Sequence, residues 1–192
     1  MLIDILISKV RVKIFELYLG NPGEIYHVRE IVRRVSEEIN AVRRELARLE
    51  KTGFLASEWR ANRRFYSAKG DYIFFNEFLS MVNKNIGLGG SILKNKAKLG
   101  KIKYAMISGS FTKGKPYTQN EVDLFVVGAI VLPELGSMIR EEEARRNREI
   151  NFTPMTEEEF NFRKNRRDPF VLSILNKPKI MLIGDEEEMV KI

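Results

Sequence analysis

The chain has 192 residues, of which 44% are hydrophobic, and a formal net charge of +7. These values are typical of a folded protein with one large or two small domains and exclude a disordered chain. It has no cysteine and one histidine, so we expect neither disulfides nor a zinc site built on Cys and His. No segment has the length of a membrane span or the pattern of a cleavable signal, and we expect a cytoplasmic protein without a membrane partner.

The positive charge lies in the first part of the chain. Residues 1–82 carry 14 Lys and Arg against 11 Asp and Glu, and residues 83–103 carry six lysines without an acidic residue. Residues 104–192 carry 13 basic and 15 acidic residues. A basic surface attracts nucleic acid, although the lysine-rich segment is equally compatible with a solvated surface. Abundant Lys, Arg and Glu without cysteine favour a thermophilic source.

Apolar residues recur at helical spacing in three segments, which predicts helices over residues 10–19, 28–35 and 37–51. Ser36 is a candidate N-cap of the third helix. Four apolar residues at intervals of three and four form its inward stripe: Ile39, Val42, Leu46 and Leu49. His27 precedes the second helix and is expected to be a capping or surface residue without catalytic chemistry.

Residues 54–59 and 63–68 alternate as two strands of a hairpin with a tip at residues 60–62. We expect Trp59 and Tyr66 to lie in the hairpin core rather than to form stacking surfaces. Three helices followed by a hairpin resemble the winged helix-turn-helix of ArsR-like and MarR-like transcription regulators over residues 8–70. The resemblance rests on Val35-Ser36, Val42, Leu46, Leu49-Glu50 and Gly53-Phe54-Leu55.

The resemblance implies that the third helix enters the major groove of double-stranded DNA and that the hairpin touches the backbone or the minor groove. Arg and Asn suit bidentate contacts with guanine and adenine edges. The candidate DNA-binding residues are Asn40, Arg43, Arg44 and Arg48 on the third helix, and Arg60, Arg63 and Arg64 on the hairpin. The alternatives are an ordinary charged surface and a winged helix that binds protein.

Residues 72–82 are apolar at helical spacing and rich in aromatic residues, and glycines at positions 87, 89 and 90 interrupt the pattern that follows. We therefore predict three parts: a winged-helix domain over residues 1–82, a helical connector over 83–100 and a second domain over 101–192. The aromatic helix favours a homodimer, with packing against the second domain as the alternative.

The second domain begins with an apolar strand at residues 104–107, then Gly109-Ser110, a short loop or helix, and a strand at 122–127. Glu121 and Asp123 are two residues apart, so on a strand both carboxylates point to one face, which suits Mg²⁺. This pattern resembles the nucleotidyltransferase superfamily, which has the DNA polymerase β-like fold. Its signature is Gly-Ser, about ten residues, and Asp-x-Asp; Glu121 stands in place of the first Asp.

The nucleotidyltransferase resemblance implies a small mixed sheet that binds Mg²⁺ and a nucleoside triphosphate. Gly109, Ser110 and Lys113 would contact the nucleotide, and Glu121 and Asp123 would hold the metal. Glu149, on a strand predicted over residues 148–153, would supply a third, catalytic carboxylate. Further helices are predicted at residues 132–146, from Thr156, at 169–175 and from Asp185, with a buried strand at 179–183.

The sequence thus predicts an α+β protein with a winged helix followed by a small nucleotidyltransferase-like α/β domain. The favoured function is a DNA-binding transcription regulator whose second domain is catalytically weak or senses a nucleotide. One alternative is an active Mg²⁺-dependent nucleotidyltransferase that modifies a protein, an RNA or a small molecule. Another is an antitoxin-like or adaptor module that binds a protein. Glu121 favours the regulator over the enzyme, and the arginine pattern favours it over the adaptor.

Overall fold

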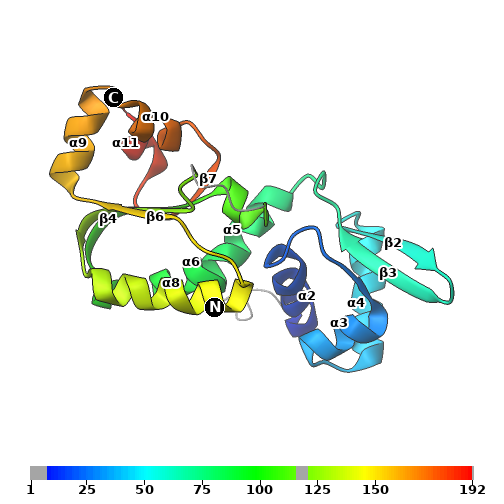
Figure 1. Cartoon of the computed structure of the whole chain (residues 1–192). Coiled ribbons are helices and arrows are strands. Elements are labelled where there is room, and N and C mark those ends of the chain that lie inside the picture. Colours follow the sequence, from blue (N-terminus) through cyan, green and yellow to red (C-terminus); the bar gives the residue numbers. More distant parts are fainter. Residues whose placement is uncertain (1–7, 116–120, 192) are drawn as a thin grey trace. The chain divides into compact units, whose positions relative to one another are not determined.

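The computed structural model describes residues 8–115 and 121–191, which form helices and two β-sheets. The chain divides into two units, Met1–Ile86 and Gly87–Ile192, and each unit contains one of the sheets (Figure 1). The α+β class is therefore confirmed. The division falls inside the predicted connector, so residues 83–86 belong to the first unit and residues 87–100 to the second.

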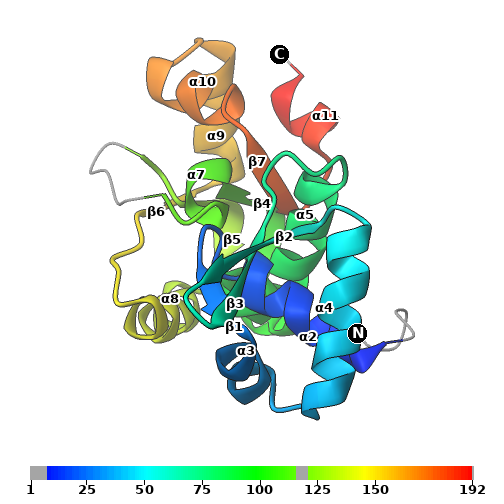
Figure 2. The ribbon, with the colours of Figure 1, turned by 90° about the vertical axis from the view of Figure 1, so that its right-hand side faces the viewer.

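The N-terminal unit consists of helices packed beside a three-stranded antiparallel sheet. The helices are α2 (Lys9–Leu19), α3 (Val28–Val35), α4 (Ile39–Lys51) and α5 (Phe75–Asn85), and the strands are β1 (Ile25–His27), β2 (Leu55–Arg60) and β3 (Arg63–Ala68). The strand order is β1-β3-β2 (Figure 2). Strand β1 has only three residues, and the sequence analysis did not predict it.

Helix α4 follows α3 after a sharp change of direction that its sequence explains. Ser36 has a left-handed backbone and ends α3, so the prediction that it caps the next helix is wrong. Glu38 caps α4 instead, because its carboxylate accepts hydrogen bonds from the amides of Asn40 and Ala41 at 2.8 Å. Val42, Leu46 and Leu49 are buried as predicted and fix α4 against the core.

The C-terminal unit is a four-stranded mixed sheet between two layers of helices. Its strands are β4 (Gly100–Ser108), β5 (Leu124–Ile130), β6 (Phe152–Met155) and β7 (Lys179–Ile183), in the order β6-β5-β4-β7. Strands β5 and β6 are parallel, and the other pairs are antiparallel. The helical segments are α6 (Gly87–Lys94), the 3-10 turn η1 (Lys96–Lys98), α7 (Gly109–Thr112), α8 (Leu132–Arg146), α9 (Glu157–Asn165), α10 (Pro169–Leu175) and α11 (Glu186–Val190).

Alternation along β4 and β5 distributes apolar side chains to both faces of this sheet. Tyr104 and Phe125 belong to a core cluster that α9, α10 and α11 complete, and α6 and α8 lie on the other face (Figure 1). The helices at 132–146 and 169–175 and the strand at 179–183 agree with the predictions. Thr156 caps α9 as predicted, since its hydroxyl accepts a hydrogen bond from the Glu159 amide.

Several predicted boundaries differ from those in the structure. The helix predicted at residues 72–82 is Phe75–Asn85, and the strand predicted at 122–127 is Leu124–Ile130. The strand predicted at 148–153 begins only at Phe152, because the amides of Ile150 and Asn151 donate to the side chains of Glu143 and Asp123. Over the described ranges, no helix combines the length and the hydrophobicity that crossing a membrane requires.

Candidate functional site

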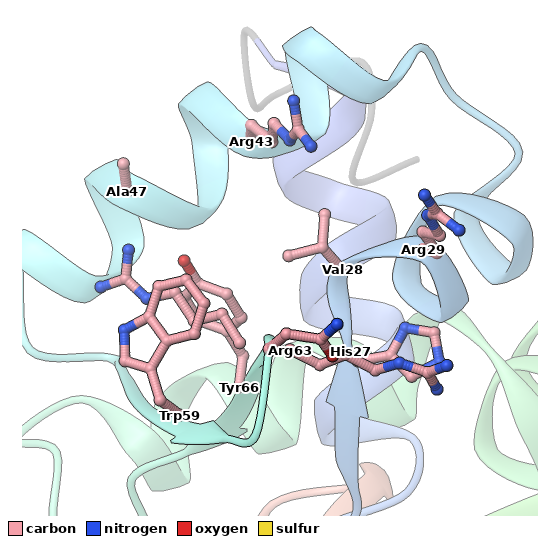
Figure 3. Close-up of a pocket in the computed structure, with 10 residues that line it drawn as sticks. His27, Val28, Arg29, Arg43, Ala47, Trp59, Arg63 and Tyr66 are labelled. Atoms are coloured by element: carbon pink, nitrogen blue, oxygen red, sulfur yellow. The ribbon is translucent and has the colours of Figure 1, made fainter.

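A pocket of about 810 Å³ lies in the N-terminal unit between α4, the start of α3 and the β2–β3 hairpin. Figure 3 shows Arg43 and Ala47 on the α4 side and Trp59 on the hairpin side, with Arg29 at the start of α3. The complete lining is His27, Val28, Arg29, Arg43, Ala47, Trp59, Asn62, Arg63, Arg64 and Tyr66. Four arginines and no carboxylate line this pocket, so it attracts anions.

Three of these arginines keep their charge available. Arg29, Arg43 and Arg63 are exposed, and none of them forms an ion pair with any residue in the part of the chain that the structure describes. They come from three elements, α3, α4 and β3, so a pocket-bound group would meet guanidinium groups from several directions. A planar guanidinium has several N–H donors in a fork that matches phosphate or carboxylate oxygens.

Arg64 differs from the other three because its guanidinium is held inside the unit. Its Nη2 donates to both carboxylate oxygens of Glu50 on α4 at 2.8 Å, and its Nε donates to the Ser57 hydroxyl at 3.0 Å. The guanidinium also lies 5.3 Å from the ring centre of Tyr66. Arg64 therefore ties the hairpin to α4, and Glu50 compensates its charge.

Trp59 is 68% exposed, so the prediction that it lies in the hairpin core is wrong. Tyr66 is buried as predicted and fills the space closer to the helices. Trp59 lies further along β2 toward the tip, opposite Arg64, where no helix covers the hairpin. Its ring faces the pocket (Figure 3), with the Arg64 guanidinium 6.0 Å from its centre.

The remaining predicted DNA-binding residues lie outside the pocket lining. Asn40, Arg44 and Arg48 are exposed on α4, and Arg48 lies 4.0 Å from the buried Glu45. Arg60, at the end of β2, pairs with Glu58 on the same strand. His27 has the predicted capping role, since its Nδ1 accepts a hydrogen bond from the Glu30 amide at 3.3 Å.

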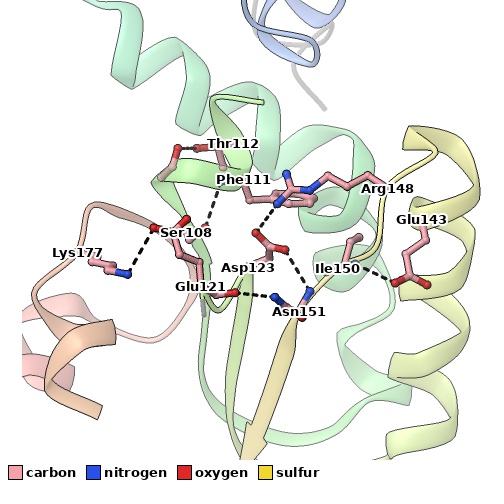
Figure 4. A network of polar contacts seen from close by, with 11 residues as sticks. Ser108, Phe111, Thr112, Glu121, Asp123, Glu143, Arg148, Ile150, Asn151 and Lys177 are labelled. Carbon is pink, nitrogen blue, oxygen red and sulfur yellow. Dashed lines mark hydrogen bonds and ion pairs between the residues drawn. The ribbon is translucent and has the colours of Figure 1, made fainter. Parts of the chain in front are cut away.

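The C-terminal unit contains a second polar cluster around Asp123, just before β5. Asp123 is buried, and both oxygens of its carboxylate have donors: Oδ1 accepts from Arg148 Nη2 at 2.8 Å, and Oδ2 accepts from the Asn151 amide at 3.1 Å (Figure 4). Burial raises the pKa of Asp123, whereas the hydrogen bonds from Asn151 and Arg148 favour its ionised form. Sequence reasoning missed Arg148 and Asn151 as its partners.

The other predicted acidic residues, Glu121 and Glu149, differ in their surroundings. Lys177 Nζ lies 3.5 Å from the Glu121 carboxylate, and Glu149 is exposed in the segment before β6 instead of lying on a strand. Within residues 8–115 and 121–191, no group of three His, Cys, Asp or Glu residues is arranged to hold a metal ion. Part of the loop before Glu121, residues 116–120, lies outside the described residues.

The surroundings of Asp123 bear directly on whether a second cation can approach its carboxylate. Mg²⁺ needs carboxylate oxygens with free lone pairs and near-octahedral geometry. Asp123 already has a guanidinium 2.8 Å from Oδ1 and an amide on Oδ2. Arg148 supplies a positive charge next to the Asp123 carboxylate. A second cation beside that guanidinium would be repelled by it.

Gly109, Ser110 and Lys113 lie in or directly after the short helix α7. The Gly109 amide donates to the Pro178 carbonyl at 2.7 Å, and a Cβ at this position would lie 2.9 Å from that oxygen. Glycine is therefore required here for close approach to Pro178, and its amide is used within the unit. Ser108, which the sequence analysis did not single out, caps α7 through its hydroxyl.

Sequence reasoning also missed Arg29 and the exposure of Trp59. Arg29 immediately follows the cap and first residue of α3, a position where a side chain can reach past the helix end, but only the packing of α3 beside the hairpin directs it to the pocket. Comparisons of the chain with protein-family models, with curated proteins and with solved structures found no match.

Proposed function

We propose that this protein is a DNA-binding transcription regulator whose N-terminal unit contacts double-stranded DNA with α4 and the β2–β3 hairpin. The observation that carries the proposal is the arginine-lined pocket between these two elements, in which Arg29, Arg43 and Arg63 have no ion-pair partner among the described residues. The order of helices and hairpin also supports a winged helix-turn-helix.

Helix α4 is the element proposed to enter the major groove. Its inner face is buried through Val42, Leu46 and Leu49, and the opposite face presents Asn40 and Arg44 to solvent. These are side chains suited to reading base edges. Arg48 forms an ion pair with Glu45, and Arg64 forms one with Glu50. We therefore propose that these two arginines contribute less to DNA contact than Arg43 and Arg44.

A homodimer is part of this proposal. Ile73 and Phe74, just before α5, are 78% and 51% exposed, whereas Phe78 of α5 stacks on Phe15 inside the unit at 4.9 Å. Phe74 lies at the edge of the same aromatic cluster, with its ring centre 6.0 Å from that of Tyr72, and about half of its surface remains exposed. A symmetric dimer through this patch would place two copies of α4 on successive half-sites.

For the C-terminal unit we propose a scaffolding or effector role with weak or no catalysis. The ion pair between Arg148 and Asp123 supports this choice, because it already compensates the charge of the carboxylate that a metal would need. The alternative is a Mg²⁺-dependent nucleotidyltransferase acting on a protein, an RNA or a small molecule. In that alternative Mg²⁺ would share the Asp123 carboxylate with Arg148 or displace it, and we therefore rank it second.

The proposal is tested by DNA binding of the full chain in a gel shift, with duplex DNA from upstream of its own gene and random duplex of equal length. Replacing Arg44 by Ala should weaken the specific complex by about 1–3 kcal/mol, roughly 5- to 150-fold, through loss of base contacts. The same loss of charge in Arg140→Ala, on the exposed side of α8, should leave affinity within about twofold. Equal affinity for both duplexes at every salt concentration would contradict the regulator function.

A further inference from the structure

The pocket between α4 and the hairpin has a more specific use, which rests on the proposed DNA binding. We infer that it holds the sugar–phosphate backbone of one DNA strand. In this arrangement Arg29, Arg43 and Arg63 contact phosphates, Trp59 packs against a deoxyribose, and Arg64 positions Trp59 without contacting DNA.

The location of the pocket matches the position that duplex geometry gives to the backbone of one strand. The major and minor grooves are separated by the backbone of one strand, so a helix in one groove and a hairpin at the next must enclose that backbone between them. The enclosed space here is the pocket bounded by Ala47 of α4 and Trp59 of β2 (Figure 3). Its volume of about 810 Å³ is in the range that accommodates groups of nucleotide size.

The charges identify which side chains meet phosphate. Arg29, Arg43 and Arg63 line the pocket from three elements and have no carboxylate partner in the described ranges. The guanidinium of Arg64 also lines the pocket, but Glu50 holds it through two hydrogen bonds of 2.8 Å. Binding phosphate through Arg64 would place an anion close to that carboxylate, so Arg64 should contribute little to phosphate binding.

Trp59 is an exposed aromatic side chain in a pocket otherwise dominated by cations. Arg64 lies 6.0 Å from the centre of its ring, and Glu50 and Ser57 fix Arg64 in turn, so the orientation of Trp59 is set before DNA arrives. The apolar face of a deoxyribose is the part of the backbone that such a ring can cover. This contact involves no ion release and should not depend on salt.

These roles predict two separate signatures in the dependence of the binding constant on salt. With the full chain and the upstream duplex, Arg29→Ala, Arg43→Ala and Arg63→Ala should each reduce the slope of log K against log salt concentration by about 0.9. Trp59→Ala should weaken binding about tenfold at every salt concentration with an unchanged slope, and Trp59→Phe should retain part of the affinity.

Arg64→Met is the matched control within the pocket, because it removes a neighbouring arginine while the slope should stay at the wild-type value. Thermal melting of each variant separates loss of fold from loss of contact. Trp59 is the single tryptophan of the chain, so its fluorescence should change on addition of duplex in step with binding of the unmodified protein.

The outcomes separate failure of DNA binding from failure of the role assigned to the pocket. If the wild-type protein binds no DNA, the proposed function fails and the inference fails with it. If it binds with a steep salt slope but Arg29→Ala and Arg63→Ala leave that slope unchanged, only the role of the pocket is overturned. Tryptophan fluorescence that does not change at saturating duplex also overturns the backbone assignment.

Discussion

Asp123 and Arg148 are 25 residues apart in the sequence and form a largely buried ion pair at the start of β5. Desolvation opposes burial of the carboxylate and raises the pKa of Asp123. Arg148 offsets part of this cost, and its guanidinium also lies 5.1 Å from the ring centre of Phe111. The pair is therefore a structural connection between β5 and the segment that leads into β6.

Replacing Asp123 by Ala should destabilise the C-terminal unit by about 3 kcal/mol, because the partly buried Arg148 loses its counter-ion and the Asn151 amide loses its acceptor. The double variant Asp123→Ala/Arg148→Ala should be less destabilised than the sum of the two single variants. Urea unfolding of the four proteins measures this coupling, and additive effects would show that the two side chains do not interact energetically.

At the scale of secondary structure, a charged group in the last turn of α8 packs against the beginning of α6. Glu142 is buried and accepts hydrogen bonds from Arg145 and Arg146 on its own helix. Gly87, with a positive φ of 61°, lies against this group, and a Cβ there would be 2.9 Å from Arg145 Nη2. The start of α6 is thus packed against charged side chains that must remain paired.

Ionisation of Glu142 makes the stability of the C-terminal unit depend on pH. Burial opposes ionisation of Glu142, but the hydrogen bonds from Arg145 and Arg146 outweigh it and lower its pKa below the ordinary value of 4.5. A lowered folded-state pKa means that the stabilisation is present above about pH 4.5 and is lost as the pH falls through the folded-state pKa.

Glu142→Gln should therefore be less stable than wild type near pH 7, and the two stability curves should converge as the pH falls through the folded-state pKa of Glu142. Denaturant unfolding at a series of pH values measures the difference. Glu141→Gln, at the exposed neighbouring position, is the matched control and should follow the wild-type curve. A constant gap between wild type and Glu142→Gln across the whole pH range would rule out ionisation of Glu142 as the cause.

At the scale of the whole molecule, each unit has its own sheet and its own core. In the N-terminal unit, α5 contributes Phe78 to an aromatic cluster with Phe15 and Phe54. Ile73 and Phe74 remain exposed beside it, and adjacent exposed apolar residues mark candidate surfaces for association.

If these residues form the proposed dimer surface, Ile73→Ser/Phe74→Ser should weaken self-association at least tenfold, because burial of both side chains is lost. Sedimentation equilibrium over a range of protein concentrations measures the change. Phe162→Ser removes another exposed aromatic residue, on α9, and should leave the association constant unchanged. A wild-type protein that stays monomeric at all concentrations would contradict the dimer.

The elements that could be predicted from the sequence are those whose signals are local. Pro169–Leu175, Lys179–Ile183 and Leu132–Arg146 agree with prediction, because caps, proline placement and apolar periodicity act within a few residues. The exposed arginines of α4 were likewise predicted, since the apolar stripe of the helix decides which face is buried.

The pairing of polar groups, in contrast, depends on tertiary packing. Glu50 compensates Arg64 but no carboxylate pairs with Arg63 in the described chain, although the two arginines are neighbours in sequence. Asp123 pairs with Arg148, and the Gly109 amide meets Pro178. Trp59 is exposed at a position opposite Arg64, closer to the hairpin tip than the β3 residues that pair with β1. Ion pairs and burial depend on groups brought together from distant positions, and no local pattern specifies that choice of partner.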